Sequence, residues 1–149
     1  MSKPVLIVGG GPAGLAAAHS LASVGKECVI VEKEDRLGGA PILSGYAKLV
    51  PTGEWAKDAI GGMVKRVEDE SSVKIVTGTK VTSFDGTPGN FAAKLSNGDA
   101  VDAEAVILCS GFTHFDSVNK PEWGFGTYED VVTTTQVEQM FSSGQGVRC

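Results

Sequence analysis

Residues 5–14 read Val-Leu-Ile-Val-Gly-Gly-Gly-Pro-Ala-Gly, and this stretch decides the fold. The apolar, β-branched run Val5–Val8 is typical of a buried parallel strand. The Ala- and Leu-rich segment from Ala13 to Val24 then favours a helix, with Gly25 as its C-terminal cap. A second apolar run, Cys28–Glu32, follows at once. This order predicts a right-handed β-α-β unit.

The glycines at the first strand-to-helix junction have the spacing Gly9-x-Gly11-x-x-Gly14, and Glu32 ends the second predicted strand. Glycines in this context, with an acid after the second strand, form the dinucleotide-binding fingerprint. Gly9 permits the sharp turn, Gly11 lets the backbone approach a pyrophosphate, and Gly14 lets the helix pack against the sheet. The free N–H groups of the helix N-terminus attract phosphate. Glu32 accepts hydrogen bonds from ribose hydroxyls and repels a 2′-phosphate. The alternative is a glycine-rich turn without a ligand.

Two further stretches point to the same kind of ligand. The run 32–39 ends in the pair Gly38-Gly39, which places a flexible turn with free N–H groups six residues after the acid. The apolar run 106–109 ends in Ser110-Gly111, which allows the chain to pass close to a bound molecule. Each pattern by itself is also compatible with an ordinary turn or strand exit. All three patterns together favour a cofactor site.

The rest of the chain predicts a single α/β domain over residues 1–149. We expect a Rossmann-like fold with a central parallel sheet and an inserted antiparallel β-meander at about residues 73–104. The supporting segments are a long loop at 33–53, a helix at Glu54–Glu70, short strands at Val73–Val76, Lys80–Phe84, Phe91–Leu95 and Ala100–Asp102, and a buried strand at Ala105–Cys109. An aromatic tail follows at 112–149, with a short helix at Thr134–Phe141.

Composition excludes several other functions. The 149 residues carry 13 basic and 18 acidic side chains, a net charge of −5, so no basic surface is available for nucleic acid. No apolar run approaches the roughly 20 residues of a membrane span, and the N-terminus lacks a signal peptide, so we expect a cytoplasmic protein. Cys28, Cys109 and Cys149 are far apart and form no Cys-x-x-Cys pair. We therefore expect neither a disulfide framework nor a metal site.

The three motifs, in this order, resemble those of the two-dinucleotide-binding-domain flavoproteins. In that superfamily the first glycine motif and its acid bind the ADP half of FAD. Residues 32–39 resemble its second signature, and Leu108–Gly111 resembles its Ala-Thr-Gly signature, with Cys and Ser in place of Ala and Thr. Val81 matches the position whose backbone meets the adenine. The resemblance implies noncovalent FAD binding by Gly9, Gly11, Pro12, Ala13, Gly14, Glu32, Lys33, Gly38, Gly39, Ala40, Val81, Ser110 and Gly111.

The aromatic tail resembles a smaller group within these flavoproteins. Residues 111–116, 120–126 and 130–133 are similar to the flavin-binding A subunit of heterodisulfide reductases and of related sulfur-metabolising complexes. No cysteine lies between Ala40 and Thr52, which disfavours an iron–sulfur cluster there and disulfide reduction of the glutathione-reductase kind. The resemblance implies an FAD-dependent redox subunit that passes electrons between a sulfur- or thiol-linked donor and iron–sulfur partner subunits. A homo-oligomer of this chain is a further possible assembly.

Two other functions stay open. One is a stand-alone FAD-dependent oxidoreductase, either NAD(P)H-linked or of the amine-oxidase, desaturase or monooxygenase kind. The other is a nucleotide-binding module without turnover. No catalytic residue is assigned, although His114, Lys48 and Lys57 are candidates for positions near a flavin. Since such flavoproteins complete the FAD site with a later segment, the length predicts a fragment, or a half-site that another chain completes.

Overall fold

The computed structural model describes residues 3–144, and the chain divides into two compact units. The first unit comprises the chain up to Gly39 together with Ile60–Gly111, and the second comprises Ala40–Ala59 and the chain from Phe112 onward. No helix within residues 3–144 is both long and apolar enough to cross a membrane. The elements are β1 (Val5–Val8), α1 (Pro12–Ser23), β2 (Cys28–Val31), α2 (Ala40–Leu43), α3 (Ala56–Glu68), β3 (Val73–Val76), β4 (Val81–Thr87), β5 (Asn90–Leu95), β6 (Ala100–Ala103), β7 (Ala105–Leu108), the short 3-10 helices Ser117–Asn119 and Pro121–Trp123, and α4 (Thr134–Ser143).

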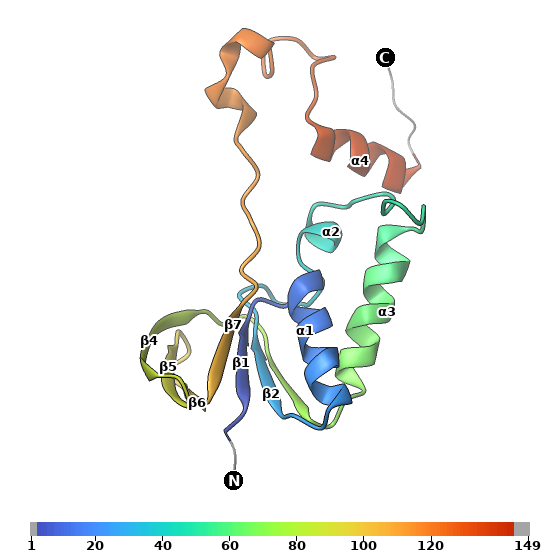
Figure 1. Ribbon diagram of the computed structural model, residues 1–149. Helices are drawn as coiled ribbons and strands as arrows, with labels where there is room; N and C mark the ends of the chain where they lie inside the picture. Colours follow the sequence, from blue (N-terminus) through green and yellow to red (C-terminus); the bar gives the residue numbers. More distant parts are fainter. Residues whose placement is uncertain (1–2, 145–149) are drawn as a thin grey trace. The chain divides into compact units, whose positions relative to one another are not determined.

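The first unit is built on a four-stranded parallel sheet with the order β3-β2-β1-β7, seen in Figure 1. Val5–Val8 pairs residue by residue with Cys28–Val31 on one side and with Ala105–Leu108 on the other. The β1-α1-β2 unit lies in the middle of this order, so the glycine turn that follows β1 lies at the carboxyl edge of the sheet. The predicted α/β fold with a central parallel sheet and an antiparallel meander is confirmed.

The two faces of the sheet are covered by different layers. Side chains alternate along a strand, so Leu6 and Ile7 point to opposite faces. Leu6, Val29 and Val31 form a buried cluster with residues of β5 and β6, and the meander therefore covers this face. Ile7 lies beneath α1 on the other face, where the position of a Cβ on Gly14 is 3.4 Å from its Cγ2 methyl. Each fully buried aliphatic side chain of this kind contributes about 1.5–3 kcal/mol.

The strand Val73–Val76 corrects the predicted extent of the meander. The sequence grouped it with the following strands because all of them are short and separated by glycine turns. In the structure it is β3, pairs in parallel with Cys28–Val31 and forms an edge of the main sheet. The antiparallel sheet contains only β4, β5 and β6, that is Val81–Ala103. Short apolar strands look alike in sequence, and only their pairing partners separate the two sheets.

Helices α2, α3 and α4 add detail to the predicted elements. The segment expected to be a loop at residues 33–53 contains the single-turn helix α2, Ala40–Leu43. Gly61 and Gly62 lie inside α3, and apart from the adjoining residues and the helix's own backbone no atom of the described chain lies within 4 Å of the place where a Cβ would stand on either. Close backbone packing therefore does not explain this glycine pair. The predicted helix at Thr134–Phe141 is α4, which begins at a capping box formed by Thr133 and Gln136.

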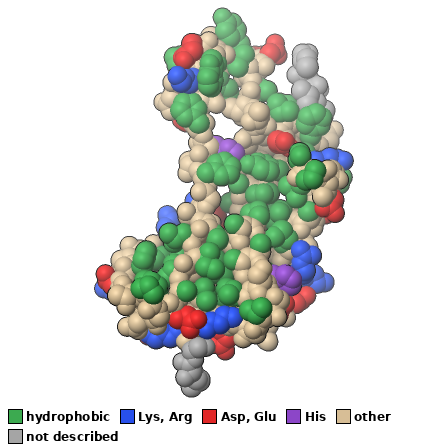
Figure 2. Space-filling view, in the orientation of Figure 1, with side chains coloured by type: hydrophobic (Ala, Val, Ile, Leu, Met, Phe, Trp, Pro, Cys, Tyr) green, Lys and Arg blue, Asp and Glu red, His purple; other side chains and the backbone are tan. Residues whose placement is uncertain are grey.

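The aromatic tail belongs to the second unit. Phe112, Phe115 and Trp123 each expose more than half of their surface. Figure 2 shows that hydrophobic side chains also lie on the visible face of the protein. Tyr128 packs within its own loop, because its ring lies against Gly124, which has a φ of 78°. Helix α4 contacts residues 44–47 of the same unit through side-chain hydrogen bonds.

Candidate cofactor-binding site

Gly9 and Gly14 are required by contacts within the protein. A Cβ on Gly9 would collide with the backbone carbonyl of Cys109, and the φ of Gly9 is 109°, which favours glycine. A Cβ on Gly14 would collide with the carbonyl oxygen of Gly9. These two glycines therefore let β1, α1 and the end of β7 meet at one point.

Gly11 differs from these two glycines because the protein itself leaves room for a side chain. Its φ of −77° and ψ of −174° suit any L-residue. Beyond its chain neighbours, the only described atom that a Cβ at Gly11 would meet is the Cα of Gly39, at 3.7 Å, which is an ordinary van der Waals distance. The described residues alone give no steric reason for glycine here. A ligand placed against the turn supplies one, because a methyl group would fill the space that the ligand needs.

The start of α1 supplies hydrogen-bond donors around this space. Gly11 is the N-cap, Pro12 is the first helical residue, and no side-chain hydrogen bond caps the helix within the described residues. The backbone N–H groups of Gly11 and Ala13 find no acceptor within residues 3–144. Unpaired N–H groups and the positive end of the helix dipole favour an anion such as a phosphate. The turn is thus a cradle for an anion.

Glu32 follows β2 and is fixed next to this cradle. Only 6% of the residue is exposed. Its Oε2 accepts a hydrogen bond from the Gly10 N–H at 2.6 Å, and its Oε1 accepts one from the Glu34 N–H at 2.9 Å. Each carboxylate oxygen keeps acceptor capacity for another donor. A vicinal diol has the two donors that such a carboxylate can accept.

The second glycine motif is packed onto the first. The Gly38 N–H donates to the Gly10 carbonyl at 2.8 Å. The Leu37 side chain and the Glu32 carboxylate occupy the space that a Cβ on Gly10 would need, while a Cβ on Gly39 would stand 2.8 Å from the Cα of Gly11. Residues 37–39 therefore form a second wall of the cradle. Sequence reasoning missed Gly10 and Leu37, although three consecutive glycines were a visible signal.

The third motif reaches the same turn from β7. The Cys109 N–H donates to the Val8 carbonyl at 2.8 Å, and the Cys109 carbonyl contacts Gly9. Ser110 and Gly111 follow as residues at the exit of the strand, and Gly111 is exposed with a φ of 70°. Burial raises the pKa of the Cys109 thiol, so it is neutral at physiological pH. A neutral thiol is a poor nucleophile, so the raised pKa of Cys109 argues against a reactive thiolate at this position.

The remaining residues of the predicted set are Val81, Lys33 and Ala40. Val81 begins β4, and two residues before it the buried Thr79 donates its N–H to the Glu32 carbonyl at 3.0 Å. Sequence reasoning missed Thr79. Lys33 is exposed, with its ammonium 3.6 Å from Glu34 Oε1. Ala40 begins α2 and belongs to the second unit. The structure thus brings the glycines, Glu32 and the end of β7 together.

The comparisons with known proteins identify the family of the chain. Residues 3–139 match the model of the family described as pyridine nucleotide-disulphide oxidoreductase. The chain belongs to this family. Among its relatives, an iron–sulfur A subunit of the CoB–CoM heterodisulfide reductase of Methanopyrus kandleri is 32% identical over 131 residues, which cover 85% of this chain and 19% of that protein.

Two other oxidoreductases show the breadth of the likeness. The ferredoxin–NADP reductase of Gluconobacter oxydans is 30% identical over 138 residues, covering 87% of this chain and 39% of that protein. The solved thioredoxin reductase of T. acidophilum superposes with a TM-score of 0.66 at 25% identity, covering 76% of this chain and 37% of that one. The chain spans less than a third of the length of the heterodisulfide reductase A subunits it matches.

Proposed function

We propose that this chain binds FAD noncovalently, with its pyrophosphate at the Gly9–Gly14 turn and the ribose of its ADP half at Glu32. The observation that carries the proposal is the open space at Gly11. An allowed backbone angle and a Cβ position that is free among the described residues leave the glycine unexplained by the protein, and the N–H groups of Gly11 and Ala13 at the same turn are unpaired within residues 3–144. The family match and the flavoprotein motifs support a flavin dinucleotide over other anions.

In this proposal each part of the site has its own task. The N–H groups of Gly11 and Ala13 bind the negative pyrophosphate oxygens, and the dipole of α1 adds to their attraction. Glu32 orients the ribose through its hydroxyls, and its charge disfavours a 2′-phosphate. Leu37 and Gly38 hold the second glycine motif against Gly10, which fixes the cradle before the ligand arrives. The flavin, when bound, supplies hydride and electron transfer.

For the whole protein we propose a redox subunit of a heterodisulfide-reductase-like electron-transfer complex in sulfur or thiol metabolism, working with iron–sulfur partner subunits. The likeness to the A subunits and the motifs of the tail support this role. The alternative is an NAD(P)H-linked FAD reductase that acts alone, which the likeness to a ferredoxin–NADP reductase favours. The remaining alternative is a nucleotide-binding module without turnover.

Loading the purified chain with FAD tests the cofactor. After gel filtration we expect the visible flavin spectrum to co-elute with the protein, and ADP to compete with FAD for binding. A protein that stays colourless after incubation with excess FAD would refute the proposal. FMN is the matched control, since it lacks the ADP half and should bind much more weakly.

Partner experiments separate the functional alternatives. In the complex proposal, iron–sulfur subunits co-purify with the FAD-loaded chain from its native cells, and the flavin exchanges electrons with them. In the stand-alone proposal, NAD(P)H bleaches the flavin absorbance without any partner. A loaded flavin that neither route reduces or oxidises would leave the non-catalytic module as the function.

A further inference from the structure

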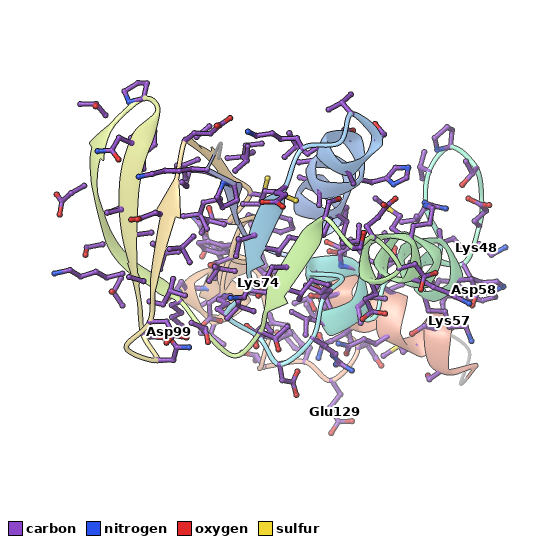
Figure 3. All side chains as sticks on the ribbon, turned by 90° about the horizontal axis from the view of Figure 1, so that it is seen from below. Lys48, Lys57, Asp58, Lys74, Asp99 and Glu129 are labelled. Atoms are coloured by element: carbon purple, nitrogen blue, oxygen red, sulfur yellow. The ribbon has the colours of Figure 1, made fainter. Side chains whose placement is uncertain are left out.

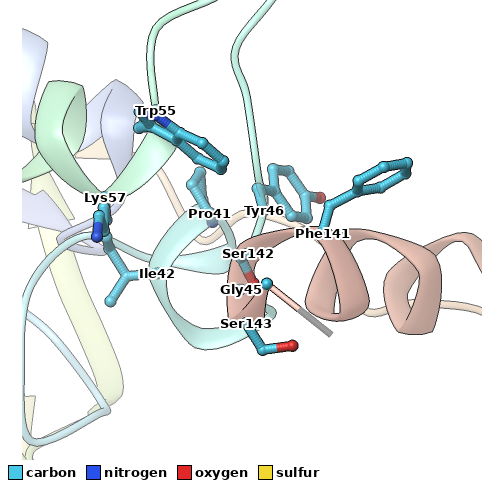
Figure 4. A pocket seen from close by; sticks show the side chains of 10 residues that line it. Pro41, Ile42, Gly45, Tyr46, Trp55, Lys57, Phe141, Ser142 and Ser143 are labelled. Atoms are coloured by element: carbon cyan, nitrogen blue, oxygen red, sulfur yellow. The ribbon is translucent and has the colours of Figure 1, made fainter. Parts of the chain in front are cut away.

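The second unit contains a pocket that shares no lining residue with the glycine turn. It has a volume of about 450 Å³, within the range of small-molecule sites, and residues of Pro41–Lys57 and of the end of α4 line it. All of these residues belong to the same compact unit. Figure 4 shows Trp55 and Pro41 on one wall, with Tyr46 and Phe141 on another.

The walls of the pocket are held in place by hydrogen bonds. The Glu138 carboxylate on α4 accepts from the Ala47 N–H at 2.7 Å, and the Gln139 side-chain amide donates to the Ser44 carbonyl at 3.2 Å. The Ala56 N–H at the start of α3 donates to the Ala47 carbonyl at 3.0 Å. The segment that carries Tyr46 is therefore connected both to α4 and to the start of α3.

The pocket combines aromatic surface with one unpaired positive charge. Trp55, Tyr46 and Phe141 line it, and flat, rigid side chains of this kind bind apolar molecules. Lys57 also lines it, and the Lys57 ammonium has no ion-pair partner within residues 3–144. Figure 4 shows Lys57 and Phe141 on opposite sides of the pocket. A ligand with an apolar body and a charged end matches this layout.

The charges around the pocket favour an anion. No carboxylate of the described residues lines it, and Glu138 is already engaged by the Ala47 N–H. A second cation, Lys48, has its Nζ 5.0 Å from the centre of the Trp55 ring. At the end of α4, the Ser142 and Ser143 hydroxyls donate to the Gln139 and Met140 carbonyls, which reduces the negative potential of that helix end.

We propose that this pocket binds a small apolar carboxylate, with its hydrocarbon body against Trp55, Tyr46 and Phe141 and its carboxylate at Lys57. Its lining residues are different from those proposed for FAD, and the proposal does not rest on flavin binding. A carboxylate fits better than a neutral ligand because Lys57 has no other ion-pair partner in the described chain. It fits better than a cation because the described lining residues hold no opposite charge for one.

Trp55 itself reports on the pocket. The chain has two tryptophans, and the other one, Trp123, is 61% exposed. Trp123→Phe leaves Trp55 as the sole tryptophan, which can be excited selectively over the tyrosines. The probe is 3-phenylpropionate, and its uncharged control is 3-phenylpropanamide. Titrated into the Trp123→Phe chain, the carboxylate should change the Trp55 emission saturably.

Two lysine variants test the charge. Lys57→Gln should weaken 3-phenylpropionate binding about two- to fivefold, which is the contribution of a solvent-exposed ion pair, and it should not affect the amide. Lys74→Gln is the matched control, because Lys74 is also an exposed lysine without an ion-pair partner in the described chain and lies on β3 in the first unit (Figure 3). Lys74→Gln should leave both affinities unchanged.

A third variant tests the apolar wall. Phe141→Ala should weaken the carboxylate and the amide alike, since both have the same hydrocarbon body. Three outcomes would overturn the proposal: no saturable change in Trp55 emission, an amide that binds as tightly as the carboxylate, or equal effects of Lys57→Gln and Lys74→Gln. Loss of carboxylate binding in Gly11→Ala would also overturn it, because the probe would then occupy the nucleotide turn.

Discussion

Replacing Gly11 with alanine separates the demands of the fold from those of the cofactor. Within residues 3–144 and beyond its chain neighbours, the new methyl group would meet only the Cα of Gly39, at 3.7 Å, and the φ of −77° suits alanine. Gly→Ala at a compatible angle stabilises a protein by about 0.4–1 kcal/mol, while alanine is a poorer N-cap residue than glycine by a similar amount. These effects oppose each other, so we expect the free energy of unfolding to change by less than about 1 kcal/mol.

FAD binding responds differently, because the methyl group occupies the space proposed for the pyrophosphate. Moving the phosphate outward breaks at least one hydrogen bond to a charged group, which is worth about 1.5–3 kcal/mol. That loss corresponds to a roughly 10- to 150-fold weaker FAD affinity. The assays are urea unfolding of the FAD-free chain and a titration of FAD absorbance or flavin fluorescence.

The matched control for this experiment is Gly61→Ala on α3, where a methyl group also meets no neighbour within 4 Å. It should leave FAD affinity unchanged. A Gly11→Ala chain that binds FAD with wild-type affinity would refute the reasoning. So would a loss of several kcal/mol in its unfolding free energy, because the fold and not the ligand would then require the glycine.

The other predictions concern stability. Gly61→Ala should itself raise the free energy of unfolding by about 0.5–1 kcal/mol, because glycine inside a helix is costly; an unchanged urea midpoint would contradict this. Gly14→Ala should strongly destabilise the chain, since its Cβ collides with the Gly9 carbonyl, and a wild-type unfolding curve would show that reasoning to be wrong. Glu32→Gln turns an amide donor toward a backbone N–H, so it should lower the free energy of unfolding, measured in urea, by about 1–3 kcal/mol. It should also weaken FAD binding. Equal FAD affinity of the variant and the wild type would argue against the ribose contact. Burial raises the pKa of the Cys28 and Cys109 thiols above their usual 9.0, so these thiols lose their protons at a lower pH in the unfolded chain than in the folded one. The free energy of unfolding should therefore fall as the pH rises above 9.0. The fall should be smaller in a Cys28→Ala/Cys109→Ala variant.

Local pattern was sufficient for the elements that form the core of the site. The run Val5–Gly14 specifies a strand, a turn and a helix through apolar periodicity, glycine and helix propensity, all of which act over a few residues. Gly9, Gly14 and Glu32 were predicted with their tasks, and the structure places them at one junction. Their FAD contacts remain a prediction for the titrations above to test.

Contacts between distant parts of the chain were not predictable in this way. Val73–Val76 looked like a meander strand, because nothing local distinguishes an edge strand of a parallel sheet from a strand of a hairpin. The roles of Leu37 and Thr79 were missed for the same reason. Leu37 packs on Gly10, and Thr79 bonds to Glu32, so each role depends on a partner far away in the sequence.

The sequence by itself determined the β-α-β unit, the glycine turn and the acid after the second strand, because these follow from the chemistry of neighbouring residues. Only the tertiary structure decided that Gly11, unlike Gly9 and Gly14, has no steric reason within the protein to be glycine. Only it brought Trp55 and Lys57 together with the end of α4 around a pocket. Free space and convergence of distant residues are properties of packing, and packing is settled by the whole fold.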